Sequence, residues 1–338
     1  KYAGKIHGIG ARYCPSIEDK VVRFADKDRH QLFVEPEGLD TTEMYVQGMS
    51  ASMPIDVQYA FLRTIPGFED VKMMRPAYAI EYDLLDPLQL YPTLEVIKLP
   101  GLYSAGQSNG TSGYEEAAAQ GLVAGINAAL KIQGKDPFIL ARHEAYIGSL
   151  VDDLVTKGAD EPYRMMTSRS EYRLILRQDN ADLRLTEKGH SIGLVGEERY
   201  ARFLERKKKY EEAMDYIRTQ RFTPKEEINQ ALESMGTAPL TTGTGADQIL
   251  KRPEMTYWKM MEMLGCPAFD EEAVEEMEIT VKYEGYIARQ EAAVRKAARM
   301  ENEKLPPDMD YLSLDGISTE ARQKMDKIRP LSLGQAAR

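Results

Sequence analysis

The chain has 338 residues, 54 of them acidic and 44 basic, and a formal net charge of −10. This length exceeds what one hydrophobic core usually supports and predicts two or three domains. The negative charge argues against a protein that wraps nucleic acid through its overall charge, and leaves room for a local basic patch. No apolar run approaches the roughly 18 to 20 residues that span a bilayer, so we expect a soluble, cytoplasmic protein without a membrane contact.

Thiol and imidazole groups are sparse. The two cysteines, Cys14 and Cys266, are far apart, and the four histidines are scattered. Neither cysteine has a paired metal-ligand spacing, so the sequence predicts neither a metal site nor a disulfide scaffold.

The first hundred residues alternate between helix and strand patterns, which indicates an α/β region. The spacing of apolar residues predicts helices over 16–25 and 54–64, and strands over 31–35, 44–47, 71–82 and 94–99.

A glycine-rich stretch follows. The apolar run 97–105 predicts a buried parallel strand that feeds a loop containing Gly110 and Gly113, and a helix of small residues that ends at Gly134. The free N–H groups and positive dipole end of that helix suit an anionic flavin ring or a phosphate. The alternative is a helix of small residues packed on a sheet with no ligand.

The second half reads as helical. Helices are expected over 197–220, 253–264 and 271–303, capping boxes at 223–226 and 332–335, and a linker at 241–246. The chain ends at Arg338, where we expect no room for the last helix to form. No Gly-x-Gly-x-x-Gly fingerprint occurs.

Two segments carry candidate chemistry. Cys14 precedes a proline-initiated helix and follows Arg12, and both neighbours favour a reactive thiolate; the alternative is a small buried side chain that caps the helix. Arg169, Arg173 and Arg177 share one face of either a helix or a strand and suit phosphates and an unstacked base. Their alternative role is ion pairing with nearby carboxylates.

Five segments together resemble one family. They are RYCPSIEDK at 12–20, GQSNGTSGYEEAAAQG at 106–121, SRSEYR at 168–173, DNADLRLT at 179–186 and YEGY at 283–286. In this order they resemble the MnmG (GidA) family of tRNA uridine 5-carboxymethylaminomethyl modification enzymes, and the similarity runs along nearly the whole chain.

This resemblance implies a fold class and four domains. The α/β part would combine a section of a glutathione-reductase-like FAD domain with an α/β nucleotide-binding insert, followed by an all-α C-terminal region. The domains would be an NADH-binding-like insert at 1–88, the closing part of the FAD domain at 89–134, a tRNA-facing helical domain at 135–245 and a C-terminal helical region at 246–338.

The resemblance also implies an activity. The family adds a carboxymethylaminomethyl or aminomethyl group to C5 of the wobble uridine of certain tRNAs. It uses FAD, NADH and methylene-tetrahydrofolate, works with the GTPase partner MnmE, and forms homodimers.

Site residues are implied by matching the motifs. Cys14 would be catalytic, as a nucleophile toward uracil or a redox-assisting thiol, and Gln107 would bind the ribityl chain of FAD, where many relatives of glutathione reductase have aspartate. The FAD contacts would be Gln107, Asn109, Gly110, Gly113, Tyr114 and Glu115. The nicotinamide-nucleotide contacts would be Gly10, Ala11, Arg12, Tyr13, Cys14, Pro15, Ser16, Ile17, Glu18, Asp19, Lys20, Val21, Val22, Arg23 and Phe24. The tRNA contacts would be Arg164, Arg169, Arg173 and Arg177.

The chain also departs from the family pattern. It lacks the FAD pyrophosphate loop and the last helical segment, so we expect it to bind FAD weakly or not at all; a stoichiometric flavin absorption band would contradict this. Two other functions stay open: a folate- and FAD-dependent tRNA uracil methyltransferase, and a non-catalytic helical module that binds tRNA or protein. The long helical region argues against the methyltransferase.

Overall fold

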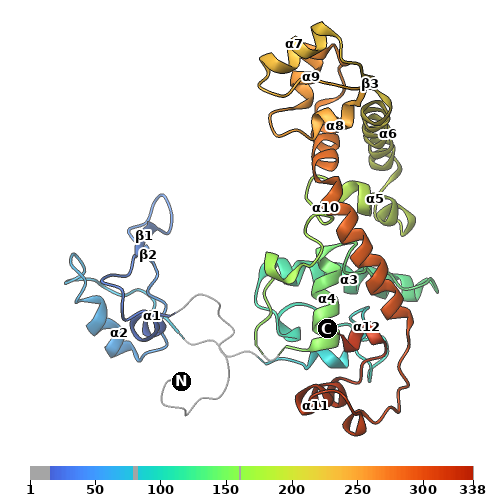
Figure 1. Cartoon of the computed structure of the whole chain (residues 1–338). Helices are drawn as coiled ribbons and strands as arrows, with labels where there is room; N and C mark the ends of the chain where they lie inside the picture. Colours follow the sequence, from blue (N-terminus) through green and yellow to red (C-terminus); the bar gives the residue numbers. More distant parts are fainter. Residues whose placement is uncertain (1–15, 79–82, 160, 338) are drawn as a thin grey trace. The chain divides into compact units, whose positions relative to one another are not determined.

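A computed structural model describes residues 16–78, 83–159 and 161–337. The contacts between Cα atoms divide the chain into two compact units, Lys1–Ala124 with Gly158–Met165, and Gly125–Lys157 with Met166–Arg338. Figure 1 labels the elements in chain order. The first unit mixes helices with a hairpin and the second is almost entirely helical, which confirms the predicted fold class.

The first unit begins with two short helices and a hairpin. Their bounds are α1 Ile17–Arg23, β1 Phe33–Pro36, β2 Met44–Gln47 and α2 Ile55–Leu62. Ser16 caps α1 through a reciprocal capping box with Asp19, which explains why the helix begins there. The strands β1 and β2 are antiparallel, with Phe33 opposite Gln47. These four predictions are confirmed, with small shifts at the ends.

Three predicted strands are not found in the described residues. The described part of 71–82, residues 71–78, contains no strand, 94–99 does not form a strand, and the run 97–105 is not a parallel strand. Residues 90–103 instead fold into tight turns joined by isolated antiparallel bridges, Leu90 with Val96 and Glu95 with Tyr103. A short 3₁₀ helix, η1 at Pro87–Gln89, precedes them. The apolar residues of this segment pack in local turns and bridges. A strand would need a neighbouring strand to pair with, and the local sequence pattern cannot show whether one is present.

The glycine-rich loop contains a 3₁₀ helix, η2 at Gly106–Asn109, and leads into α3 at Tyr114–Ile132. Gly134 ends α3 with φ of 66°. Its N–H bonds to Lys131 O at 3.1 Å, and Lys135 N bonds to Leu130 O at 2.9 Å. These two bonds form a Schellman motif, so the predicted cap at Gly134 is confirmed.

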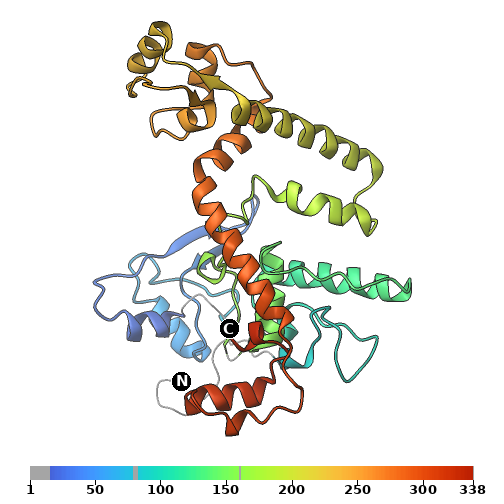
Figure 2. The ribbon, with the colours of Figure 1, turned by 45° about the vertical axis from the view of Figure 1, so that its right-hand side comes forward.

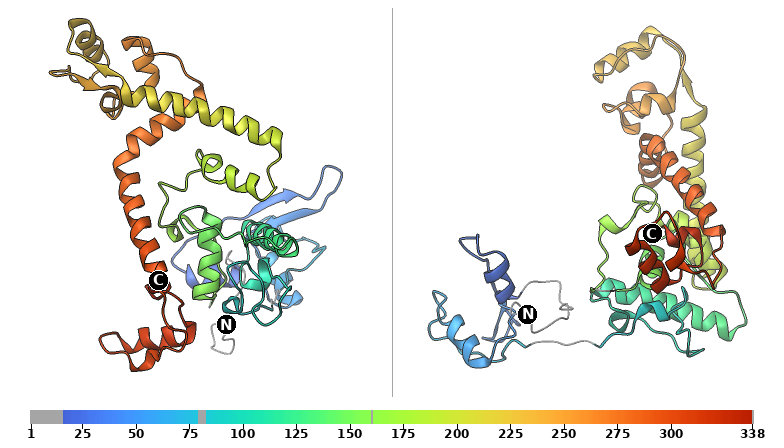
Figure 3. Two further views of the ribbon diagram at one scale, coloured as in Figure 1. Left: turned by 90° about the vertical axis from the view of Figure 1, so that its right-hand side faces the viewer. Right: turned by 60° about the horizontal axis from the view of Figure 1, so that its bottom comes forward.

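The second unit is built from helices. Their bounds are α4 Tyr146–Lys157, η3 Thr167–Arg169, α5 Ala181–Ser191, α6 Glu197–Thr219, α7 Glu226–Ser234, α8 Ala246–Leu250, α9 Tyr257–Leu264, α10 Glu271–Asn302, η4 Tyr311–Ser313, α11 Thr319–Ile328 and α12 Leu333–Ala336. Two short strands, β3 Arg221–Phe222 and β4 Thr244–Gly245, pair antiparallel. In Figure 2, α6 and α10 approach each other at the end that carries α7, α8 and α9. Figure 3 shows α12, in dark red, beside the last turns of α10, whereas α11 lies beyond the loop that follows α10.

A buried cluster forms the core of this helical region. It includes Ala213, Met214, Ile217, Phe222, Leu232, Leu240, Ala246, Ile249, Leu250, Met255, Tyr257, Met260, Cys266, Val274, Met277 and Val281. The cluster therefore draws residues from both sides of position 245. The four-domain division of the chain stays a prediction.

Three local predictions in this unit are wrong. Lys225, without a side-chain bond, occupies the cap position of α7, so Thr223 does not form the expected box. The helix expected from 253 begins at Tyr257, where Thr256 Oγ1 accepts from Lys259 N. At the C-terminus Ser332 caps α12, which does form within the chain. No helix in the described part of the chain is long and apolar enough to cross a membrane.

Candidate cofactor loop and arginine turn

A buried polar network fixes the loop that precedes α3. Asn109 and Gln120 are both completely buried, and Asn109 Nδ2 donates to Gln120 Oε1 at 2.8 Å. Asn109 also bonds Ser104, and Gln120 Nε2 donates to Thr111 Oγ1 at 3.0 Å. Because buried amides are costly to leave unpaired, this network specifies one loop conformation.

The internal packing of the loop explains why glycine occupies these positions. Gly106 and Gly110 have φ of 83° and 80°, values that favour glycine. A Cβ on Gly110 would lie 2.9 Å from the Ala159 Cβ. The glycines are thus required by the fold itself, whether or not a ligand approaches.

The six predicted FAD contacts share this loop and the first turn of α3, and the structure separates them into two groups. Asn109, Gly110 and Gly113 are buried and hold the loop. Gln107, Tyr114 and Glu115 are exposed, and the Tyr114 side chain is 95% exposed. The Gln107 amide has no hydrogen-bond partner among the described residues, so it is open to a ligand.

Charge at the start of α3 is balanced within the protein. Glu116 is completely buried, and its Oε1 accepts from Met165 N at 2.6 Å. Arg164 lies 3.5 Å from Glu115 and 3.6 Å from Glu116. A Cβ on Gly113 would lie 1.8 Å from Glu116 Oε2, so this glycine makes room for the carboxylate. Two carboxylates beside one guanidinium offset the positive end of the helix dipole.

These observations test the loop against a flavin nucleotide. A free amide at Gln107 and an exposed ring at Tyr114 fit a hydroxyl-rich, flat ligand. The carboxylates of Glu115 and Glu116 do not favour a phosphate at the same place. The carboxylates at the start of α3 therefore disfavour a pyrophosphate there, and the exposed Gln107 amide remains able to bond hydroxyl groups.

The predicted nicotinamide segment is described only in part. Residues 10–15, including Cys14, lie outside the described residues, and Ser16 to Phe24 form α1 and its caps. This helix is tied to the 48–52 loop, since Ser52 N donates to Glu18 Oε1 at 2.8 Å and Lys20 Nζ to Gly48 O at 2.8 Å.

The predicted arginine row does not lie on a regular element. Residues 170–180 form turns after η3, so the shared face expected of a helix or strand does not exist. Arg177 pairs with Asp179 at 2.9 Å and with the buried Glu276 at 2.8 Å, which is the ion-pairing alternative. Arg173 is exposed and has no polar partner among the described residues. Arg164 belongs to the other compact unit.

Glu276 shares a site with Asp179. Burial, followed by the neighbouring Asp179 carboxylate, raises the pKa of Glu276 to about 7. The pKa of Asp179 moves down: burial opposes this shift, and hydrogen bonds from Glu276 and Arg177 outweigh it. Burial and the neighbouring carboxylate therefore favour the protonated form of Glu276 and the ionised form of Asp179.

Three residues that organise this turn were not found from the sequence. Arg142 is 8% exposed and pairs with Asp152 at 2.9 Å, Asp153 at 2.7 Å and Glu171 at 2.5 Å. Gln290 Oε1 accepts from Leu174 N at 3.1 Å and Ile175 N at 3.2 Å, and its Nε2 donates to Glu171 O at 3.0 Å. Glu276 is the third. Their partners lie up to 119 residues away, which no local spacing reveals.

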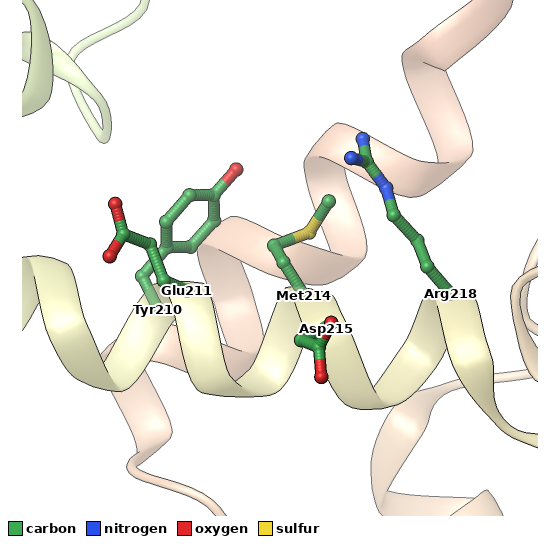
Figure 4. A pocket seen from close by; sticks show the side chains of 5 residues that line it. All are labelled: Tyr210, Glu211, Met214, Asp215 and Arg218. Carbon is green, nitrogen blue, oxygen red and sulfur yellow. The ribbon is translucent and has the colours of Figure 1, made fainter.

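A shallow depression of about 340 Å³ lies on α6 (Figure 4). Tyr210, Glu211, Met214, Asp215 and Arg218 line it. The Arg218 guanidinium lies 3.9 Å from Glu284 of α10. In the described ranges no group of three or more His, Cys, Asp or Glu side chains is placed to hold a metal ion.

Known proteins resemble the chain along its whole length. The tRNA uridine 5-carboxymethylaminomethyl modification enzyme MnmG of Caldicellulosiruptor saccharolyticus is 56% identical over 338 residues, and so is that of Clostridium kluyveri. Each comparison covers 100% of this chain and 54% of the relative, so the chain spans about half the length of the curated relatives it matches. Two crystal forms of Aquifex aeolicus GidA match at 47% identity with TM-scores of 0.77 and 0.75, covering 96% and 98% of this chain and 52% of the other.

Three family models also match. Residues 1–136 match Glucose inhibited division protein A, 197–291 the C-terminal helical domain of tRNA modifying enzyme MnmG/GidA, and 293–338 its C-terminal helical bundle. All three models describe one family, in the order in which its parts occur here. Together with relatives that are 56% identical over an alignment of all 338 residues, they place the chain in the MnmG (GidA) family.

Proposed function

We propose that this chain is part of an enzyme that modifies the wobble uridine of tRNA at C5, adding a carboxymethylaminomethyl or aminomethyl group, and that it is inactive by itself. The names of relatives 56% identical over the whole chain support this reaction. The cofactors would be FAD and NADH, with methylene-tetrahydrofolate as carbon donor. The partners would be tRNA, the GTPase MnmE and a second copy of the chain, in the cytoplasm.

One observation carries the cofactor proposal: the Gln107 amide is exposed, has no partner among residues 16–78, 83–159 and 161–337, and lies on a loop whose conformation is fixed by the buried Asn109–Gln120 bond. A fixed amide can donate to one ribityl hydroxyl and accept from another, without adding a charge. Asn109 and Gln120 act through the loop, as positioning residues. FAD, when bound, would supply the redox chemistry by accepting a hydride from NADH.

The remaining proposed roles follow the family motifs. Gly10 to Phe24 would hold NADH, and Cys14 would act as a nucleophile toward uracil or as a redox-assisting thiol. Among the proposed tRNA contacts, Arg173 is exposed without a polar partner in the described part of the chain. Arg177 and Arg164 are paired with carboxylates, so a phosphate would have to compete with these pairs. Arg169 completes this set.

The matches to helical-domain models over 197–291 and 293–338 favour this activity over the uracil methyltransferase. The product tells the two apart. A strain lacking the gene should lose the C5-modified wobble uridine and keep 5-methyluridine, as measured by mass spectrometry of its tRNA. Normal wobble uridine in that strain would contradict the proposal.

The cofactor role needs a sharper test. In the full-length enzyme Gln107→Ala should weaken FAD binding up to about tenfold, because one or two hydrogen bonds are lost. Gln133→Ala removes an equally exposed amide at the other end of α3 and should leave FAD binding unchanged. Equal FAD affinity for both variants would remove Gln107 from the cofactor site.

A further inference from the structure

Helix α10 carries an exposed aromatic pair that the proposed chemistry does not use. The side chains of Tyr283 and Tyr286 are 46% and 57% exposed, and their ring centroids lie 6.4 Å apart. The guanidinium carbon of Arg289 lies 5.7 Å from the Tyr286 ring centroid. Neither hydroxyl has a hydrogen-bond partner in the described part of the chain. Two large rings therefore face solvent without a structural reason for being there.

Basic residues continue the same face of α10. At about 100° per residue, Tyr286, Arg289, Ala293 and Lys296 fall within an arc of about 80°. Arg289 and Lys296 are exposed and form no ion pair with any described residue. The face thus begins with aromatic rings and continues with two uncompensated positive charges.

The acidic residues of this part of α10 lie on its other side. Glu284 and Glu291 are about 140° or more from Tyr286 around the helix. Glu284 pairs with Lys251 at 2.6 Å, and Glu291 with Arg295 at 3.8 Å. Charge is sorted around the helix in a chain whose net charge is −10.

The turn at 171–175 lies against the same stretch of helix. Gln290, one helical turn after Tyr286, bonds the backbone of Leu174 and Ile175. Arg173, in this turn, is exposed and has no polar partner among the described residues. The turn that carries Arg173 therefore lies against the helical turn that follows Tyr286 on α10.

We propose that Tyr283 and Tyr286 form a stacking surface for unpaired nucleotides of an RNA, with Arg289, Lys296 and Arg173 contacting the neighbouring phosphates. This inference rests on the proposed function, since tRNA is the RNA that the activity requires. Aromatic rings stack on any base, and guanidinium groups beside them bind phosphate and add cation–π contacts. The other residues between Tyr283 and Lys296 on this face are the polar Gln290 and the small Ala293, so the surface lacks the large aliphatic patch of a stable protein interface.

The test is binding of the 338-residue chain to an unmodified tRNA transcript and to a fully paired RNA duplex. Tyr286→Ala should lower the affinity for tRNA about tenfold, whereas Tyr286→Phe, which keeps the ring, should stay within about twofold of the original chain. Duplex affinity should be the same for all three, because paired bases offer no face to stack. Circular dichroism melting confirms that each variant is folded.

The charges are tested by salt dependence. Arg289→Gln should reduce the slope of log affinity against log salt by about 1. Arg295→Gln removes the same charge from the opposite side of α10, where the side chain is 64% exposed, and should leave the slope unchanged. Equal slopes for the two variants would overturn the assignment of phosphates to this face.

The possible outcomes separate the two proposals. Unchanged tRNA affinity of Tyr286→Ala, equal losses on tRNA and duplex, or no tRNA binding by the original chain would each overturn the stacking surface. Loss of affinity for the GTPase partner with normal tRNA binding would assign the face to a protein instead. Wobble modification in cells is measured independently, so it can stand or fall without this surface.

Discussion

The side-chain nitrogen of Asn109 lies 2.8 Å from the side-chain oxygen of Gln120, and both residues are completely buried. This contact joins the glycine-rich loop to the second turn of α3. Because Gln120 also bonds Thr111 and the Glu116 carbonyl, one side chain ties three points of the loop and helix together.

Gln120→Ala should therefore lower the free energy of unfolding of the first unit by about 2–3 kcal/mol, since Asn109 Nδ2 loses one of its two acceptors and Gly106 N loses its acceptor in a buried site. Urea unfolding measures this loss. Gln133→Ala, an exposed glutamine just after α3, should change stability by less than about 0.5 kcal/mol. Similar losses for the two variants would show that the network does not stabilise the loop.

Two glycines in and before α3 should respond oppositely to alanine. A Cβ on Gly113 would meet Glu116 Oε2 at 1.8 Å and Arg164 Nη1 at 2.4 Å, so Gly113→Ala should destabilise by about 1–3 kcal/mol. Nothing lies within 4 Å of a Cβ on Gly121, and alanine is the better helix former there. Gly121→Ala should raise the thermal midpoint of this chain; a decrease would mean that a neighbour covers this side of α3.

The Glu276–Asp179 pair should make stability depend on pH. The pKa of Glu276 rises from 4.5 to about 7 in the folded chain, so between these values the folded state binds more protons and stability falls as pH rises. Asp179 shifts down, and its contribution is lost only as pH falls below its ordinary range near 3.8.

Glu276→Gln should abolish the decline between about pH 5 and 7, a difference on the order of 1–3 kcal/mol. Unfolding curves at several pH values measure it. Glu275→Gln, the exposed neighbour on α10, should keep the slope of the original chain. A slope that persists in Glu276→Gln would assign the pH dependence to another group.

Arg142 should be the most sensitive ion-pairing residue of the second unit. Arg142→Ala would remove one of the two counter-charges of Asp153, whose side chain is 5% exposed and which keeps Lys157 at 2.9 Å, and should cost about 1.5–3 kcal/mol. Arg202→Ala removes a 72% exposed side chain at 3.8 Å from Glu198 and should have little effect. Thermal unfolding of both variants gives the comparison, and equal midpoints would exclude a stabilising role for Arg142.

Local sequence signals predicted the helices well. Ser16 with Asp19, and Gly134, define helix ends through bonds between residues three to five apart, so their effect is visible in the sequence. Local sequence could not show whether 97–105 forms a strand. Its apolar residues pack into turns and bridges, because strand formation depends on partners that lie elsewhere in the chain.

The candidate sites also differ in whether they depend on local or on distant contacts. The glycine-rich loop was found from its motif, and the structure adds that half of its predicted ligands are structural. The arginine spacing predicted a common face, but Arg177 bonds Glu276, 99 residues away. Such a pairing follows from the packing of α10 against the turn and has no signature in either segment.

Gln290 and Glu276 hold the two ends of the 171–179 segment from a single helix. They are 14 positions apart, which corresponds to about 21 Å along the axis of α10. The segment is consequently attached to α10 at both of its ends. A nucleic acid that binds either the segment or α10 would restrict the motion of both, and amide hydrogen exchange should slow along the whole of 171–179 and the part of α10 beside it.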